Sequence, residues 1–180
     1  MIGQRVYLRI LEQSDLPTTQ KWISDPEFSK IIGYLPTKSL KQQEQWYDTN
    51  LNDNSRYIFA ICLRDNHEHI GNVALGRIDY VSRNAMYSIF IYEKDYRSKG
   101  YGSEATRLIL DFGFKQLNLH KIYLQVSQDN DSAIRMYESL GFVWEGTQRE
   151  HFYSDGKYVD KYVYSILKRE YEDYLLELES

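Results

Sequence analysis

The sequence contains a single cysteine, Cys62, among its 180 residues. One cysteine cannot form a disulfide within the chain, and its apolar, strand-like surroundings favour a small buried side chain over a nucleophile. No apolar signal core opens the sequence, and no run approaches the roughly 18 apolar residues of a membrane span. These absences predict a protein of the reducing cytoplasm with no membrane segment.

The sequence also lacks a marked excess of one charge sign. It has 22 lysine and arginine residues against 26 aspartate and glutamate residues, a formal net charge of −4. Because a general nucleic-acid binder needs a basic surface, we predict no nucleic-acid partner. The four histidines, at positions 67, 69, 120 and 151, lack the spacing of a metal site, so we predict no metal. Those at 67, 69 and 120 are expected on the surface.

Apolar residues make up 42% of the chain, enough for one domain over residues 1–180 with a substantial core. Strand patterns occur at 6–10, 57–63, 70–75, 87–92 and 122–126. Helices are predicted from the cap at Ser14-Asp15 through Trp22, and over 40–51 behind a cap at Thr37 or Ser39. This front segment carries four large aromatic residues that would ordinarily belong to the core, the position that we favour for Trp22: Trp22, Phe28, Tyr34 and Trp46.

The last third predicts a closing hairpin over 142–167 with Asp155-Gly156 at its tip. Its alternation is expected to turn polar residues outward and aromatic residues inward. A final helix over 168–178 has an apolar side that docks on the body or serves a homodimer. That side consists of Tyr171, Tyr174, Leu175 and Leu178.

The most informative stretch of the sequence is a glycine-containing turn between a predicted strand and a predicted helix. Residues 87–92 are rich in β-branched and aromatic residues, and apolar residues recur with helical spacing from Ala105 to Phe112. A helix start offers unpaired N–H groups and a positive dipole end to an anion, and Gly100 and Gly102 leave those amides unobstructed. Taken alone, Arg97-x-x-Gly100-x-Gly102 matches neither the Walker loop nor the dinucleotide fingerprint, so an ordinary turn remains open.

A second motif follows about thirty residues later. Strand 122–126 leads through a polar turn into a helix over 132–140, which Gly141 closes. This segment reads Asn130-x-x-Ala133-x-x-x-Tyr137-x-x-x-Gly141-Phe142. The ordered pair of motifs resembles the GNAT superfamily of acetyl-CoA-dependent N-acetyltransferases.

The resemblance implies an α/β fold with a mixed, mostly antiparallel sheet of about seven strands flanked by helices. It implies acetyl-CoA as co-substrate and direct attack by a primary amine in a ternary complex. The closing hairpin and the residues Ser165-Ile166-Leu167 resemble the branch that contains ribosomal-protein N-terminal and spermidine acetyltransferases. That branch implies a small polyamine or a protein N-terminus as acceptor; an amino sugar or an antibiotic is the alternative. In the resemblance the front segment builds one wall of the acceptor site, so the alternative for its four aromatic residues is that they line this wall.

The resemblance also assigns roles by position. The residues that match the loop holding the coenzyme's diphosphate are Arg97, Lys99, Gly100, Gly102 and Ser103. Asn130 matches the asparagine that meets the coenzyme arm. A strand amide near Ile91 is expected to stabilise the thioester carbonyl. In related sequences the strand that contains this amide carries a bulge. Tyr137 matches the tyrosine that protonates the departing thiolate. A tyrosine suits this role, because a group with a pKa of about 10 is protonated at neutral pH. A plain core aromatic is the alternative for Tyr137.

The sequence departs from the family pattern at the position of the general base, the group that receives the proton of the amine. Many relatives have a glutamate near the start of the strand before the loop, where this sequence has Met86 and Tyr87, neither a good base at neutral pH. The open alternatives are Asp79, Glu104, Glu150, His151, water connected to bulk solvent, or an amine that arrives neutral. The departure also leaves open a coenzyme-binding regulatory module without catalysis.

Overall fold

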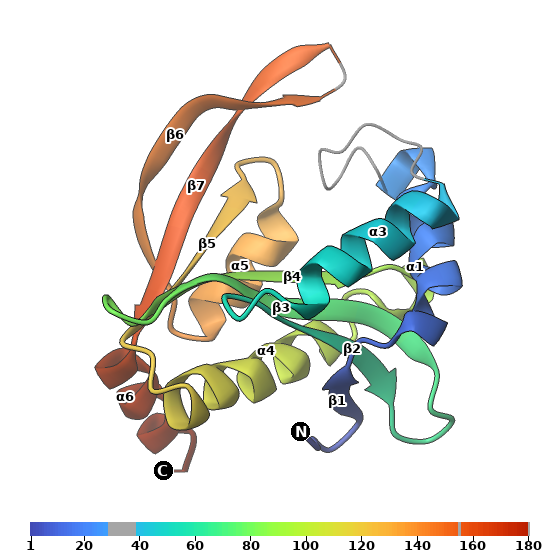
Figure 1. The fold of residues 1–180 in the computed structure, drawn as a ribbon. Coiled ribbons are helices and arrows are strands. Elements are labelled where there is room, and N and C mark those ends of the chain that lie inside the picture. Colours follow the sequence, from blue (N-terminus) through green and yellow to red (C-terminus); the bar gives the residue numbers. More distant parts are fainter. Residues whose placement is uncertain (29–38, 155, 180) are drawn as a thin grey trace.

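The backbone forms a seven-stranded sheet in the order β1-β2-β3-β4-β5-β7-β6, in a computed structural model that describes residues 1–28, 39–154 and 156–179 (Figure 1). The strands are β1 Val6–Ile10, β2 Tyr57–Leu63, β3 His69–Asp79, β4 Asn84–Ile91, β5 Lys121–Ser127, β6 Val143–Ser154 and β7 Lys157–Leu167. Only the β4–β5 pair is parallel. The predicted α/β fold with a mixed, mostly antiparallel sheet is confirmed.

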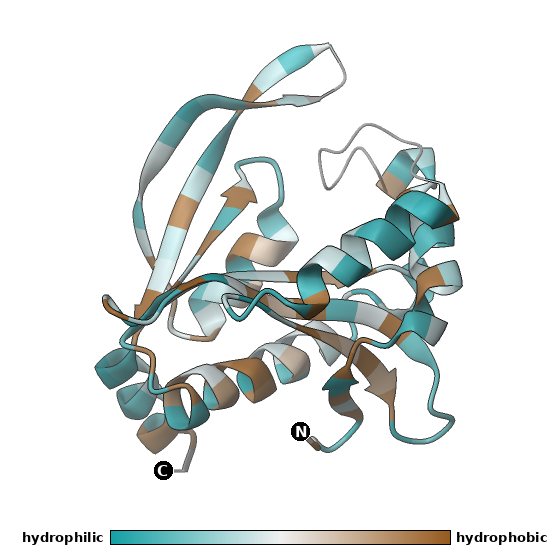
Figure 2. Ribbon diagram, viewed as in Figure 1, coloured by the Kyte–Doolittle hydropathy of each residue, from teal (hydrophilic) through white to brown (hydrophobic). Residues whose placement is uncertain are grey.

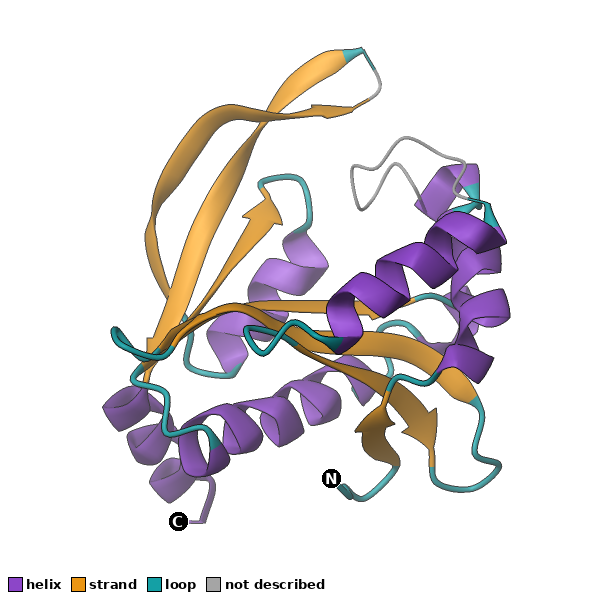
Figure 3. Cartoon of the chain, in the orientation of Figure 1, coloured by secondary structure: helices purple, strands orange, loops and turns teal. Residues whose placement is uncertain are grey.

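Helices cover both faces of the sheet (Figure 3). They are α1 Leu16–Ile23, α3 Leu40–Leu51, α4 Tyr101–Asp111, α5 Asp131–Ser139 and α6 Lys168–Glu179, with short turns η1 Gln13–Asp15, η2 Lys94–Tyr96 and η3 Phe112–Gln116. In Figure 1, α4 and α6 lie below the sheet, whereas α1 and α3 lie on the other side. The predicted helix over 40–51 is confirmed by α3. The Ser39 hydroxyl caps this helix by accepting from the Gln42 N–H.

Burial on both faces of the sheet explains why β2 is a continuous run of apolar residues. Phe59 and Ile61 face the main core with α4, whereas Ala60 and Cys62 face a smaller core under α3. Both faces of this strand are therefore buried, so its sequence does not alternate with polar residues. Figure 2 shows the hydrophobic colouring along the inner strands and along α4. Cys62 is fully buried, as the sequence predicted.

Aromatic residues of the front segment form a third cluster. Trp22 and Phe28 are buried with Tyr92, and the Trp22 and Tyr92 rings stack with centroids 4.0 Å apart. The core assignment of Trp22 is confirmed. Trp46 packs, partly buried, on the core beneath α3, and Tyr34 lies outside the described residues.

Two predictions for the last third are wrong in part. Tyr164 is buried, but Tyr153 and Tyr158 are 61% and 66% exposed. They lie near the end of the β6–β7 hairpin, which extends past the rest of the sheet, and none of the described helices covers them (Figure 1). The final helix docks through Tyr171, whose ring stacks on Phe114, whereas Leu178 is 59% exposed because only the first turns of α6 contact the body.

Candidate active site

The strands β4 and β5 part at the centre of the sheet. They pair only through residues 84–86 with 121–123, although both continue beyond that point. The backbone groups of β4 after Met86 that face β5 therefore have no ladder partner on that side. The two strands therefore leave an opening in the sheet beyond Met86.

The direction of the Ile91 amide follows from the β3–β4 ladder. The Tyr92 N–H donates to the Ile70 carbonyl at 3.1 Å, and Ile91 lies opposite Gly71 in the same register. Because hydrogen-bonded and non-hydrogen-bonded pairs alternate in an antiparallel ladder, the Ile91 N–H points away from β3, toward the side where β5 has parted. The expectation of a bulge in β4 is wrong: the register shift lies at the other end of the ladder, where β3 carries the extra residue between Gly76 and Asp79.

The loop after β4 ends in an open helix start. Gly100 has φ +83° and is the N-cap of α4, and the first helical bond runs from the Glu104 N–H to the Gly100 carbonyl. The preceding amides of α4, those of Tyr101, Gly102 and Ser103, have no partner within the helix. A Cβ at Gly102 would be in ordinary van der Waals contact with the Met136 sulfur of α5, 3.4 Å away, so the first turn of α4 lies directly beside α5 at this position. Three neighbouring donors with a positive dipole end suit a diphosphate.

The two basic residues of the loop behave differently. The Arg97 guanidinium donates from Nε to the Ile91 carbonyl at 3.0 Å and from Nη2 to the Tyr92 carbonyl. Arg97 therefore ties the loop to the end of β4, a role that the motif alone did not indicate. Lys99 is exposed to solvent.

The second motif places its residues beside the same opening. Asn130 is the N-cap of α5, since its Oδ1 accepts from the Ala133 N–H at 3.2 Å. Tyr137 is 7% exposed and lies edge-on to Tyr87, with ring centroids 6.0 Å apart. Burial raises the pKa of Tyr137, so the hydroxyl carries its proton at neutral pH, which is the state that a proton donor needs. No hydrogen bond occupies this hydroxyl among the described residues.

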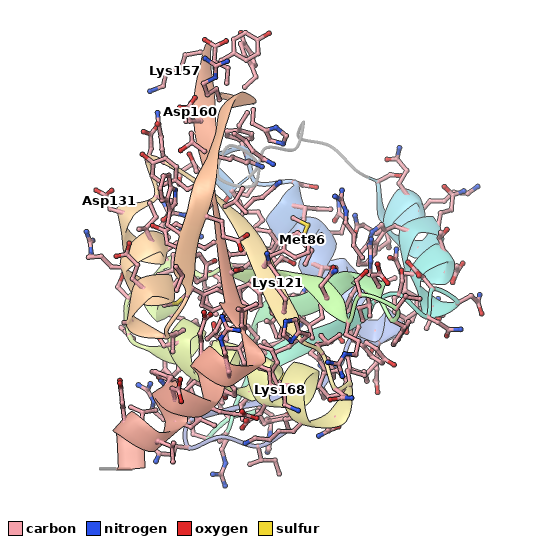
Figure 4. The ribbon with its side chains drawn as sticks, turned by 90° about the vertical axis from the view of Figure 1, so that its left-hand side faces the viewer. Met86, Lys121, Asp131, Lys157, Asp160 and Lys168 are labelled. Carbon is pink, nitrogen blue, oxygen red and sulfur yellow. The ribbon has the colours of Figure 1, made fainter. Side chains whose placement is uncertain are left out.

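The departure at Met86 and Tyr87 has a structural explanation. Tyr87 points into the main core and its hydroxyl lies 2.7 Å from Thr106 Oγ1, which in turn donates to the Gly102 carbonyl. Burial holds the Tyr87 pKa far above its usual value, so this side chain supports the loop and is not a base. Met86 alternates with Tyr87 and projects on the face away from α4 (Figure 4).

Two of the candidate bases are fully engaged elsewhere. The Asp79 carboxylate accepts from the Val81 and Ser82 amides and the Ser82 hydroxyl, and these bonds lower its pKa. Glu104 is bound by Arg5 and has a lowered pKa. Glu150 and His151 are exposed on β6, where Arg149, Glu150 and Asp160 line a cavity of about 500 Å³.

A buried polar cluster on the front side was missed by the sequence prediction. His69, expected on the surface, is half-buried beside Trp22, and its Nε2 donates to Asn72 Oδ1 at 2.8 Å. Its Nδ1 is buried without a hydrogen-bond partner, 3.6 Å from the Asp15 carboxylate. Arg9 binds that carboxylate through two short bonds, 2.6 and 2.7 Å. Hairpin position predicted exposure, but α1 covers this end of β3.

Comparisons with known proteins agree with this geometry. A family model described as "Acetyltransferase (GNAT) domain" matches residues 5–143. The spermidine N(1)-acetyltransferase of Vibrio cholerae is 32% identical over 171 residues, 94% of this chain and 97% of that protein. The spermidine N(1)-acetyltransferase of Escherichia coli is 31% identical over 166 residues, 92% of this chain and 88% of that protein.

A solved structure shows the same fold. The crystal structure of spermidine N-acetyltransferase from Vibrio cholerae in complex with CoA and spermine has a TM-score of 0.89, and the match covers 94% of this chain and 99% of that one at 32% identity. Across the described parts of the chain, no helix has both the length and the apolar character needed to cross a membrane.

Proposed function

Because the chain belongs to the GNAT acetyltransferase family, whose members transfer an acetyl group from acetyl-CoA to an amine, we propose that its acceptor is a primary amine of a small polyamine. The chain is an acetyl-CoA-dependent N-acetyltransferase. The observation that carries the polyamine is the likeness over 94% of the chain to a spermidine acetyltransferase solved with CoA and spermine. We also propose that residues 1–180 form one acetyltransferase domain.

The donor is held by the loop and by β4. The amides of Tyr101, Gly102 and Ser103 hold the diphosphate, with Lys99 supplying a positive charge nearby, and the Asn130 amide group meets the coenzyme arm. The thioester lies where β4 and β5 part, so its carbonyl oxygen accepts from the Ile91 N–H. The alternation in the β3–β4 ladder supports this placement, because it turns that N–H away from β3.

The reaction is a direct transfer. The neutral amine nitrogen attacks the thioester carbon, the C–N bond forms, and the C–S bond breaks as the oxyanion collapses. Tyr137 then donates its proton to the departing thiolate, which its buried and protonated hydroxyl supports. Holding the two substrates together removes much of the entropic cost of their meeting.

The amine proton leaves through water in this proposal. Tyr87, Asp79 and Glu104 are engaged in the bonds described above, which argues against each of them as the base. Glu150 and His151 are exposed, so each is in contact with the solvent that takes the proton. A polyamine that binds as its neutral form needs no stronger base.

A thiol-release assay tests the proposal. Wild-type protein and acetyl-CoA are incubated with spermidine, spermine, ribosomal-protein N-terminal peptides and amino sugars, and CoA binding is measured separately by calorimetry. We expect turnover with the polyamines. Turnover confined to peptides or to amino sugars would contradict the polyamine assignment and leave acetyl transfer intact.

Two further predictions stay with this proposal. The homodimer is supported by the exposed Leu176 and Leu178 of α6, and light scattering tests it. The cytoplasmic location predicted from the sequence is tested by cell fractionation.

A further inference from the structure

Arg5 contacts the loop from the far end of the sequence. Its Nη1 donates to the Lys99 carbonyl at 2.8 Å, across 94 residues, and its Nε donates to Glu104 Oε2 at 3.1 Å. Its guanidinium carbon also lies 4.9 Å from the centroid of the Tyr101 ring. All three partners belong to the loop or to the first turn of α4, so one side chain contacts three residues around the start of this helix.

The Glu104 carboxylate fixes this arrangement to the backbone. It is 7% exposed and its Oε1 accepts from the Arg5 N–H at 2.8 Å and from the Val6 N–H at 3.2 Å. Burial alone would raise the pKa of this carboxyl, but these bonds and the Arg5 charge outweigh burial and lower the pKa. The carboxylate is therefore charged, and it joins α4 to the start of β1.

The contact with Lys99 sets the direction of the next amide. A trans peptide unit is planar, and its C=O and N–H point in opposite directions. Because the Lys99 carbonyl points to Arg5, the Gly100 N–H points away from Arg5. The fit is close, since a Cβ on Gly100 would lie 2.9 Å from Arg5 Nη2.

We propose that Arg5 is a positioning residue for the coenzyme: by holding the Lys99 carbonyl and the Glu104 carboxylate, it presets the helix start between them, whose amides bind the diphosphate. The proposal rests on the placement of the diphosphate under the proposed function. Arg5 acts through the loop and does not touch the reacting atoms. A preset loop loses less conformational freedom on binding, which strengthens affinity.

Calorimetry with CoA on the full chain tests this role. The variants are Arg5→Ala and Arg5→Lys, since lysine keeps the charge beside Glu104 but lacks the fork that reaches Lys99 and Glu104 together. The control is Arg64→Ala, because the Arg64 side chain donates to the Gly3 carbonyl in the same terminal segment without touching the loop. We expect both Arg5 variants to raise the Kd for CoA by about ten-fold, a change of about 1.4 kcal/mol, and Arg64→Ala to leave it unchanged.

Turnover with a truncated donor separates positioning from loss of fold. S-acetylpantetheine has no diphosphate, so Arg5→Lys should lower kcat/KM for acetyl-CoA but not for S-acetylpantetheine. Equal losses with both donors, or full CoA affinity in both Arg5 variants, would overturn the role. An effect that disappears with 3′-dephospho-CoA would also overturn it, in favour of direct contact with the 3′-phosphate.

The outcomes distinguish this inference from the proposed function. CoA binding needs no acceptor, so a wrong acceptor leaves the test intact. If Gly100→Ala and the Arg5 variants all bind CoA like the wild type, the placement of the diphosphate is wrong. If Gly100→Ala weakens binding and the Arg5 variants do not, only the role of Arg5 fails.

Discussion

The loop before α4 and the β6–β7 hairpin are both built around a glycine of positive φ, yet they differ in support. Gly100, with φ +83°, lies against Arg5, and the Arg97 side chain ties the same loop to β4. Gly156, with φ +81°, has no described residue other than its chain neighbours within 4 Å of where its Cβ would be. The donor side is held by distant side chains bound to backbone atoms, whereas beside Gly156 the structure shows an exposed ion pair between Lys157 and Asp129. The difference teaches that the same local turn chemistry gains tertiary support only where distant side chains reach it.

The largest effect on turnover is expected from a substitution on the donor side, at Tyr137. We expect Tyr137→Phe to lower kcat by about 100-fold, because it removes the proton donor of the leaving thiolate. CoA affinity should stay at the wild-type value, since the ring remains in place against Tyr87 and Phe142. Thiol-release kinetics and calorimetry measure the two quantities. A variant with unchanged kcat would return Tyr137 to the role of a core aromatic.

The matched glycines test the comparison itself. Gly100→Ala and Gly156→Ala each place a Cβ at positive φ, so each should lower the free energy of unfolding by about 1–2 kcal/mol. Only Gly100→Ala should weaken CoA binding, because only that loop presents amides to the diphosphate. Chemical denaturation and calorimetry provide the measurements. Equal losses of CoA affinity in both variants would break the comparison.

A substitution on the hairpin should affect the other substrate. Asp160→Asn keeps an oxygen that can accept from the Glu150 N–H but removes a negative charge from the cavity on β6 and β7. We expect the KM for spermidine to rise about two- to five-fold and the KM for acetyl-CoA to stay constant. Asp129→Asn, on an exposed carboxylate paired with Lys157, is the control. A change in the acetyl-CoA KM alone would contradict the division into two sides.

The smallest effect concerns the front cluster around His69. Burial lowers the His69 pKa below its usual 6.5, so as pH falls through 6.5 the unfolded chain takes up this proton before the folded chain does. Stability should therefore decline as the pH falls from about 7 through 6.5, before the Asp15 carboxylate, whose pKa is also lowered, begins to titrate. Thermal unfolding across this range measures the decline. His69→Gln should flatten it, and an equal decline in that variant would exclude His69 as the cause.

Most of the fold could be predicted from local signals. Ser39 and Asn130 cap helices and Gly141 has φ +86°, because cap and turn preferences depend on a residue's own φ/ψ and its immediate neighbours. The periodicity of 105–112 gave the buried Ala105 and Ile109, although Leu108 and Phe112 are only half-buried. The exposed Leu178 shows the limit, since an apolar pattern does not say where the partner surface ends.

The sequence by itself determined the elements, the two motifs and their order, and with them the family. The tertiary structure alone decided that Arg5 supports the loop, that Arg97 binds the end of β4, and that Tyr87 bonds to Thr106 in the core. The physical reason is that spacing and propensity act over a few residues. A contact such as that between Arg5 and Lys99, 94 residues apart, exists only once the sheet has brought β1 beside α4.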